Sequence, residues 1–252
     1  MRNIFAIVAI ILCLTSNAQQ FYGSYMPFGL GANLSISKDD ALSPMSYSGV
    51  LGQMESGYLY QNKNWISSFS LSGSGGIQKP DVNRENHPSS TLSISARARY
   101  SLSYRITAIK SWQVFAGISS LNLWDYRGHE RYSNSSFNFS GIFAAGPVFT
   151  AQREFKLFNK NWGFQYDLTV PVGSYVFRPS YIKPYFSNEI GYKSFEFWGD
   201  YFHLDSKAQL AYFLPNGNQL RLIYNWEYAQ LNIPNKMQHA RHSLVLSTLF
   251  KF

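Results

Sequence analysis

The sequence has few of the features that stabilise ordinary exported proteins or helical membrane proteins. Its single cysteine, Cys13, excludes an intrachain disulfide framework of the kind found in small secreted domains. Charged residues make up only 14% of the chain, against about 25% in typical soluble domains. Beyond the N-terminal residues, no run approaches the roughly 18 apolar residues that a membrane-spanning helix needs. We therefore expect neither disulfides nor membrane-spanning helices.

Aromatic residues and strict alternation are what the chain has in abundance. Phe, Tyr and Trp make up 17% of it, and residues 91–106 alternate between polar and apolar without interruption. Because successive residues of a strand point to opposite faces, this stretch predicts one long, two-faced β-strand. A soluble sandwich would turn the apolar face inward. A membrane barrel would turn it to lipid and place Arg97, Arg99 and Arg105 in a polar lumen.

The N-terminal residues have the pattern of a secretory signal peptide. Arg2 precedes an apolar run over residues 4–14, and small residues follow up to Ala18. We expect a signal peptide at residues 1–18, removed on export, and a single barrel domain at residues 19–252.

Alternating patterns predict ten strands in the rest of the chain. They span residues 26–37, 45–60, 65–77, 91–106, 112–126, 137–152, 162–177, 203–214, 219–232 and 242–252. Short turns follow the second, fourth and eighth strands, a somewhat longer connection follows the sixth, and polar or extended ones follow the odd strands. Transmembrane barrels have this alternation of short turns and long loops. The predicted fold is all-β, an antiparallel up-and-down transmembrane barrel.

Three places depart from the regular pattern. The phase of the fifth strand slips near Ser119, which predicts a bulge. Pro171 lacks the amide hydrogen that a paired strand uses. The aromatic segment 178–202 either forms a loop that caps the barrel or docks a partner, or it adds strands at 185–192 and 194–202 and makes twelve.

The six tryptophans fall into two groups along the predicted strands. Three of them open strands at the short-turn end, and three lie toward the long-loop end: Trp65, Trp112 and Trp162, then Trp124, Trp198 and Trp226. Membrane barrels carry aromatic girdles at both interfaces. A soluble sandwich gives no reason for this separation, so the pattern favours the membrane barrel.

The last eleven residues, HSLVLSTLFKF, place Leu246 and Phe250 on one face and end in Phe252. This strand resembles the terminal strand of Gram-negative outer-membrane β-barrel proteins, which the barrel-assembly machinery reads. The resemblance implies a location in the outer membrane, with Leu246, Phe250 and Phe252 as the assembly signal. The partners it implies are outer-membrane lipid including lipopolysaccharide, the assembly machinery, and a larger envelope protein complex. We expect no nucleic acid, cofactor or metal.

With the apolar faces turned outward, charged residues of both signs line the predicted lumen. They are Glu55, Arg97, Arg99, Arg105, Asp167, Asp205, Lys207, Arg221, Glu227 and Lys251. In a barrel of about ten strands these charges should pair across a narrow interior, since isolated buried charges are costly. The alternative is an anion-preferring pathway lined by Arg97, Arg99, Arg105 and Arg221.

The five histidines are predicted at the extracellular end, where His203 and Asp205 share one strand face. His203 and Asp205 are weak catalytic candidates. The pair resembles the acidic and histidine residues of the ten-stranded omptin proteases only distantly, because the order and spacing of the omptin motif are not matched. The leading hypothesis is a non-enzymatic accessory or partner subunit of an envelope transport, secretion or assembly system. The alternatives are a narrow anion-preferring solute channel and a rim hydrolase acting on lipid or peptide.

Overall fold

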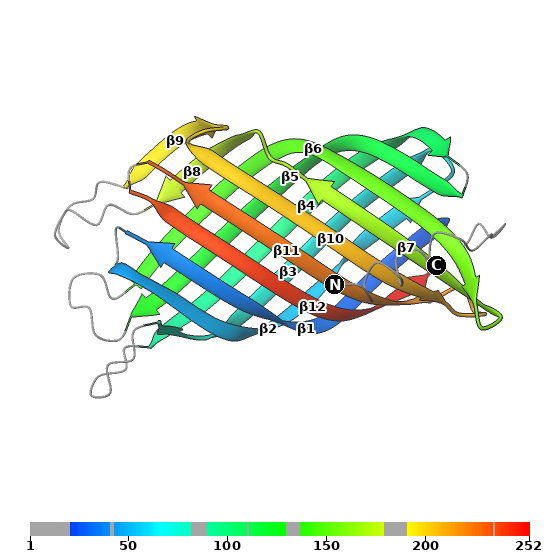
Figure 1. Ribbon diagram of the computed structural model, residues 1–252, viewed down its shortest axis with the longest axis horizontal. Helices are drawn as coiled ribbons and strands as arrows, with labels where there is room; N and C mark the ends of the chain where they lie inside the picture. The colour runs from blue at the N-terminus through cyan, green and yellow to red at the C-terminus, as the bar shows by residue number, and fades with distance from the viewer. Residues whose placement is uncertain are drawn as a thin grey trace, which may run out of the picture.

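The computed structural model describes residues 21–40, 43–81, 90–109, 111–129, 137–178, 191–233 and 235–252. These residues form twelve β-strands (Figure 1). The strands are β1 (Gly23–Asp39), β2 (Ser43–Gln61), β3 (Trp65–Pro80), β4 (Thr91–Ile109), β5 (Trp112–His129), β6 (Phe137–Leu157), β7 (Lys160–Thr169), β8 (Gly173–Arg178), β9 (Tyr192–Phe197), β10 (Tyr201–Phe213), β11 (Gln219–Leu231) and β12 (Met237–Lys251). Within the described ranges, no helix has the length and apolar character needed to cross a membrane.

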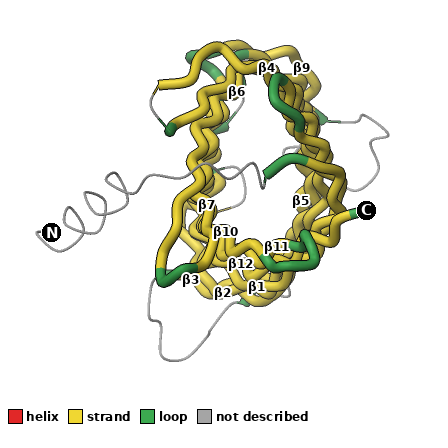
Figure 2. Tube along the Cα trace, turned by 90° about the vertical axis from the view of Figure 1, so that its right-hand side faces the viewer, coloured by secondary structure: helices red, strands yellow, loops and turns green. Residues whose placement is uncertain are grey.

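Ten of the twelve strands close into one antiparallel barrel. Strands β1 to β7 pair in chain order, β7 pairs with β10, and β10, β11 and β12 lead back to β1. In a view along the barrel, the strands form a closed ring (Figure 2). The register of the closing pair is unbroken from Tyr25↔Lys251 to Asp39↔Met237. The predicted all-β, ten-stranded antiparallel barrel is confirmed.

The two ends of the barrel differ in their connections. Four hairpins turn at one end within a few residues, at 62–64, between Ile109 and Trp112, at 158–159 and at 214–218. Phe158 and Asn159 both have positive φ angles, 52° and 56°, which is typical of a two-residue type I′ turn. The longer connection expected after the sixth strand is therefore wrong, because β6 continues to Leu157. In membrane barrels the short turns lie on the periplasmic side.

The outer wall carries large apolar side chains. On β4, Leu92 and Ile94 point outward and are exposed, while Arg97 points inward and is buried. Exposed apolar residues on other strands include Leu30, Leu34, Val50, Met54, Phe143, Phe149, Leu222 and Leu246. Soluble monomers rarely expose so much contiguous apolar surface, whereas lipid acyl chains solvate it. The apolar side chains of the alternating pattern therefore face lipid rather than a protein core.

The predicted seventh strand is broken in two at Pro171. Both pieces, β7 and β8, pair with β6. Around the break, the amides of Val170 and Val172 donate to the carbonyl oxygens of Pro147, at 3.1 Å, and Ala145, at 2.9 Å. Proline has no amide hydrogen to offer, so the break places it where the ladder requires none.

Strands β8 and β9 lie outside the closed circuit. β8 pairs with residues 141–145 of β6, and β9 pairs with β8. In the part of the chain that the structure describes, no strand pairs with the other edge of β9. The barrel thus has ten strands rather than the alternative of twelve. Segment 178–202 contains the last residue of β8, all of β9 and the first two residues of β10, and the proposed strand start at 185 lies outside the described residues.

β5 runs without the bulge predicted near Ser119. Its register with β6 is constant, and the irregularity on its other side lies in β4, between Arg105 and Thr107. The sequence phase slips because Leu121 and Leu123 are apolar residues that point into the barrel, where both are buried. The rule that apolar residues face lipid therefore fails locally on β5.

Candidate functional site

A layer of ion pairs crosses the middle of the barrel. Glu227 of β11 is fully buried and accepts hydrogen bonds from Arg97 of β4 and from Arg241 of β12, the latter at 2.8 Å. β4 and β11 are five strands apart in the ring of ten, so the Arg97–Glu227 pair spans the lumen. Arg99 of β4 and the buried Asp205 of β10 form a second pair across the interior.

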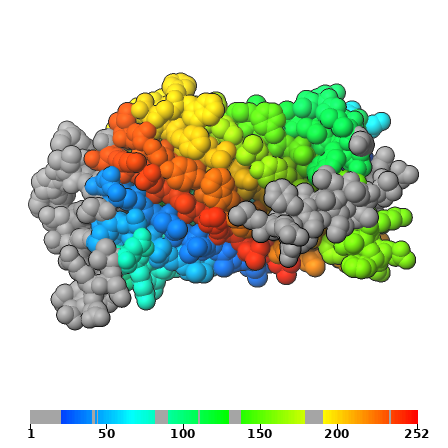
Figure 3. All heavy atoms as spheres, in the orientation of Figure 1, coloured from blue at the N-terminus to red at the C-terminus, as the bar shows by residue number. Residues whose placement is uncertain are grey.

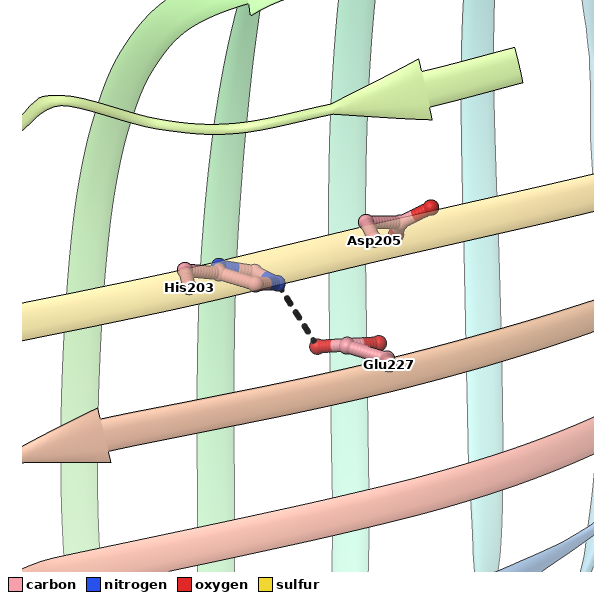
Figure 4. A group of neighbouring side chains, drawn as sticks. All are labelled: His203, Asp205 and Glu227. Carbon is pink, nitrogen blue, oxygen red and sulfur yellow. Dashed lines mark ion pairs between the residues drawn. The ribbon is translucent and has the colours of Figure 1, made fainter.

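His203 completes this layer. Its side chain points toward Glu227 on the neighbouring strand, and Asp205 follows two residues later on β10 (Figure 4). Nε2 of His203 lies 3.3 Å from Oε1 of Glu227, at an angle that makes an electrostatic contact but no hydrogen bond. Nδ1 lies 2.7 Å from the hydroxyl of Tyr201. We call Arg97, Arg99, His203, Asp205, Glu227 and Arg241 the central ion-pair layer.

Within the described ranges, His203, Asp205 and Glu227 have the donor set of a metal site, with ligand atoms within 4.8 Å of one another. The surrounding charges argue against such a site. Arg97 and Arg241 already form ion pairs with the carboxylate of Glu227, and Arg99 forms one with the carboxylate of Asp205. A divalent ion would have to displace guanidinium groups that neutralise the same carboxylates in a buried setting. The arrangement fits paired charges better than a metal centre.

On the periplasmic side of this layer lies a cavity of about 90 Å³ with both polar and apolar walls, which we call the periplasmic chamber. One of its walls holds two charges separated by two glutamines. Arg221 donates to the side-chain oxygens of Gln209, at 2.9 Å, and Gln165, at 3.4 Å. The amide nitrogens of the same glutamines donate to Asp167 at 2.8 Å and 3.0 Å. Neutral amides therefore satisfy both charges on this wall.

The N-terminal residues of the described chain fill the periplasmic mouth of the barrel. Phe21 is buried, and its backbone amide donates to Glu154 at 3.0 Å. Its ring packs edge-on against Phe213, with centroids 5.1 Å apart, and the guanidinium of Arg221 lies 5.6 Å from its centroid. Gly163 makes room for this ring, since a Cβ there would overlap it. Beside it, an apolar cluster is formed by Tyr25, Leu59, Ile66, Phe115 and Leu249.

The extracellular end of the barrel is closed by a third group of side chains. Arg178 of β8 donates to both carboxylate oxygens of Asp39 on β1, each at 2.7 Å, and the pair is buried. An apolar cluster lies inside the barrel on this side, formed by Leu121, Leu123, Ile142, Ala144, Val176, Tyr201, Leu231 and Met237. Side chains thus fill the interior at both ends and in the middle.

The structure places the residues predicted to line the lumen on the inner faces of their strands. Arg97, Arg99 and Glu227 belong to the central ion-pair layer, whereas Glu55, Asp167, Lys207 and Arg221 line the periplasmic chamber. Arg105 lies near the periplasmic end of β4, opposite the inward-pointing Phe115, and Lys251 lies with its ammonium 5.9 Å from the Tyr25 ring centroid. Leu246, Phe250 and Phe252, which the sequence predicts as an assembly signal, are exposed on the outer surface.

The four histidines that the structure describes do not form an exposed rim site. His203 and His129 are buried inside the barrel, and His239 lies 3.0 Å from the Ser35 hydroxyl. His242 points outward and lies 2.7 Å from the hydroxyl of Tyr224. His87 lies outside the described residues.

Several lumen residues were missed because the predicted strands were too short. β12 begins at Met237 rather than at residue 242, and this extension brings Arg241 into the central layer. Likewise, β6 continues past residue 152 and places Glu154 next to the N-terminal segment. Continuing the alternation by a few residues in each strand would have found both.

This closed ten-stranded barrel, with an apolar outer wall and a charged interior, has the fold of the bacterial outer-membrane β-barrel proteins. No protein-family model and no curated protein matches the sequence. Among solved structures, the outer membrane protease OmpT from Escherichia coli matches with a TM-score of 0.55 at 8% identity, over 91% of this chain and 97% of that chain. The translocator domain of the autotransporter NalP from Neisseria meningitidis matches with a TM-score of 0.40 at 9% identity, over 100% of this chain and 95% of that chain. Ail, the attachment invasion locus protein of Yersinia pestis, matches with a TM-score of 0.33 at 10% identity, over 91% of this chain and 99% of that chain. At these identities the likeness concerns the fold alone.

Proposed function

We propose that this protein is a closed, non-conducting outer-membrane barrel that serves as an accessory subunit of a larger envelope system. The observation that carries the proposal is the central ion-pair layer. Arg97–Glu227 and Arg99–Asp205 join opposite walls, so passage through the lumen requires the separation of buried ion pairs. Breaking a buried pair costs several kcal/mol, about 3–5 where one partner is lost. A barrel that is closed in this way exerts its function through its surface.

The surface around β9 supports a role in binding a partner. Phe195, Phe197 and Trp198, in β9 and directly after it, are 72%, 70% and 60% exposed. β9 lies toward the end of the barrel opposite the short turns (Figure 1) and belongs to the yellow region of Figure 3. β9 also presents an edge to which no described strand is paired. Open strand edges and exposed aromatic side chains are common sites of protein association. A partner can therefore dock here by adding a strand and covering the rings.

A conductance measurement tests the closed lumen. We expect the refolded mature chain, reconstituted in planar bilayers, to show no stable conductance steps, because ion pairs and aromatic side chains occupy the interior. A general porin inserted under the same conditions serves as the positive control. Stable unitary steps from the wild-type chain would contradict the closed barrel.

Co-purification tests the proposed partner. A tagged chain extracted from its native membrane in mild detergent should retain a stoichiometric partner, identified by mass spectrometry. Replacing Phe195 and Phe197 by serine should reduce the recovered partner at least tenfold, because the exposed rings supply the apolar contact. Phe158→Ser is the matched control, since Phe158 is 87% exposed on a periplasmic turn. A lone monomer, or equal loss in the control, would argue against a partner at β9.

The second candidate function is a narrow solute conduit that opens by rearrangement of the central layer. The periplasmic chamber favours it, because a purely structural interior has no need of an internal cavity. A hydrolase at His203 and Asp205 has less support, since both residues are fully or almost fully buried and a lipid or peptide cannot reach them.

A further inference from the structure

The periplasmic chamber is lined by serine and threonine side chains, by apolar side chains and by a few charged and amide groups. Inward-pointing serines of β3 and β4 form one wall, where the hydroxyls of Ser68 and Ser101 lie 2.7 Å apart. A second cavity of about 40 Å³ adjoins the chamber and shares Glu55, Ser70 and Lys207 with it. Small side chains on two strands therefore leave space that larger residues fill elsewhere in the barrel.

Two charges of opposite sign face this space without an ion-pair partner among the described residues. They are Glu55 of β2 and Lys207 of β10, both half-buried and both on the walls of the two cavities. The other charges nearby are satisfied. Arg99 is paired with Asp205, and glutamine amides bond both Asp167 and Arg221.

An unpaired carboxylate and an unpaired ammonium in one confined cavity are costly unless water or a ligand compensates each of them. A ligand that carries a cation and an anion at opposite ends satisfies both at once. A simple anion or a simple cation satisfies only one. The hydroxyl and amide groups of the walls supply the remaining hydrogen bonds.

The size of the chamber sets the size of this ligand. A buried water occupies roughly 10–15 Å³ of cavity volume in the same measure. A chamber of about 90 Å³ thus holds on the order of six waters, or a molecule with a similar number of heavy atoms. This is the size of a small amino acid and is too small for a disaccharide.

We propose that the periplasmic chamber binds a small zwitterion of amino-acid size. Its carboxylate faces Lys207, and its ammonium faces Glu55. This inference goes beyond the accessory role, because it requires only that the solute reaches the chamber and not that the barrel conducts.

The route to the chamber is through the periplasmic mouth. There Phe21 lies beside the apolar cluster around Tyr25 and Phe115. Phe21 belongs to no strand and is held by its contacts with Glu154, Phe213 and Arg221. Displacing this segment breaks no rung of the barrel. Movement of Phe21 therefore eases exchange through the mouth, while Glu55 and Lys207 determine the affinity.

Equilibrium dialysis of the refolded mature chain in detergent, with radiolabelled L-alanine as the probe, tests the proposal. We expect saturable binding of one L-alanine per chain. Glu55→Gln and Lys207→Gln should each weaken binding at least tenfold, because each removes one of the two compensating charges. Asp81→Asn and Lys160→Gln are the matched controls, since both residues are exposed and neither lines the chamber, and their binding should equal the wild type.

Two further measurements separate loss of the site from loss of the fold. Ser70→Leu fills the chamber without changing its charge and should also abolish binding, while the heat-dependent gel mobility of a folded barrel remains. Propionate and ethylamine, each with one charge, should compete at least tenfold less well than unlabelled alanine. The proposal is overturned by absence of saturable binding to the wild type, by unchanged affinity in folded Glu55→Gln and Lys207→Gln, or by propionate competing as well as alanine.

Discussion

Replacing Glu227 by alanine should lower the free energy of unfolding by about 3–5 kcal/mol, among the largest effects expected of any single substitution in this barrel. Glu227 is fully buried and is the shared acceptor of Arg97 and Arg241. Its removal leaves two guanidinium groups in the interior without a counter-charge. An uncompensated buried charge costs far more than the pair itself contributes, because its desolvation is no longer offset. Urea titration of the protein in lipid vesicles measures the loss.

A triple variant separates the cost of unpaired charge from the loss of packing. Replacing Arg97, Glu227 and Arg241 together by methionine removes the carboxylate along with both guanidinium groups that it compensates, and most of the lost stability should return. Asp81→Asn removes an exposed carboxylate and should change stability by less than about 0.5 kcal/mol. A change below about 1 kcal/mol in Glu227→Ala would mean that water or lipid headgroups compensate the arginines.

The substitution Gly117→Ala should be nearly as damaging, at about 1–3 kcal/mol, although it adds only one methyl group. Gly117 lies on the inner face of β5, where a Cβ would overlap the carbonyl oxygen of Leu102 and lie 2.5 Å from Cα of Ser103. These are backbone atoms of the neighbouring strand, so no side-chain rotation relieves the clash. The two strands must move apart, and the hydrogen bonds between them lengthen. The same vesicle titration measures the effect.

Gly52→Ala is the matched control for this prediction. Gly52 also lies in the middle of a barrel strand, but a Cβ there would meet only the carbonyl oxygen of Gly75, at 3.9 Å. The change should therefore stay within about 0.5 kcal/mol, as for other surface substitutions. Equal losses in the two variants would indicate a general cost of replacing strand glycines in this barrel and would refute the close-approach argument.

The alternation of residue types predicted the barrel because it is a property of the strand itself. In residues 91–106 every second side chain is apolar, and a strand of any register places those side chains on one face. The direction of that face followed from the tryptophan levels and the alternating connections. The same reasoning placed Arg97, Asp167, Arg221 and the other charged residues inside.

The alternation failed where apolar residues serve the interior. Leu121 and Leu123 point into the barrel and pack in its apolar cluster, so the apparent slip in phase was read as a bulge. Strand ends were also predicted too short, because a long strand that rises above the membrane no longer needs an apolar outer face. Arg241 was lost from the predicted interior in this way.

The sequence by itself determined the fold class, the inward or outward face of most residues, and the presence of opposed charges in the lumen. Only the tertiary structure decided which charges meet. Arg97 and Glu227 are 130 residues apart, and their contact depends on the number of strands in the ring and on the register of each pair. In the closed barrel, Glu55 and Lys207 face a cavity. Whether an inward-pointing charge forms an ion pair depends on the residues of the opposite wall, and the sequence around the charge does not specify those residues.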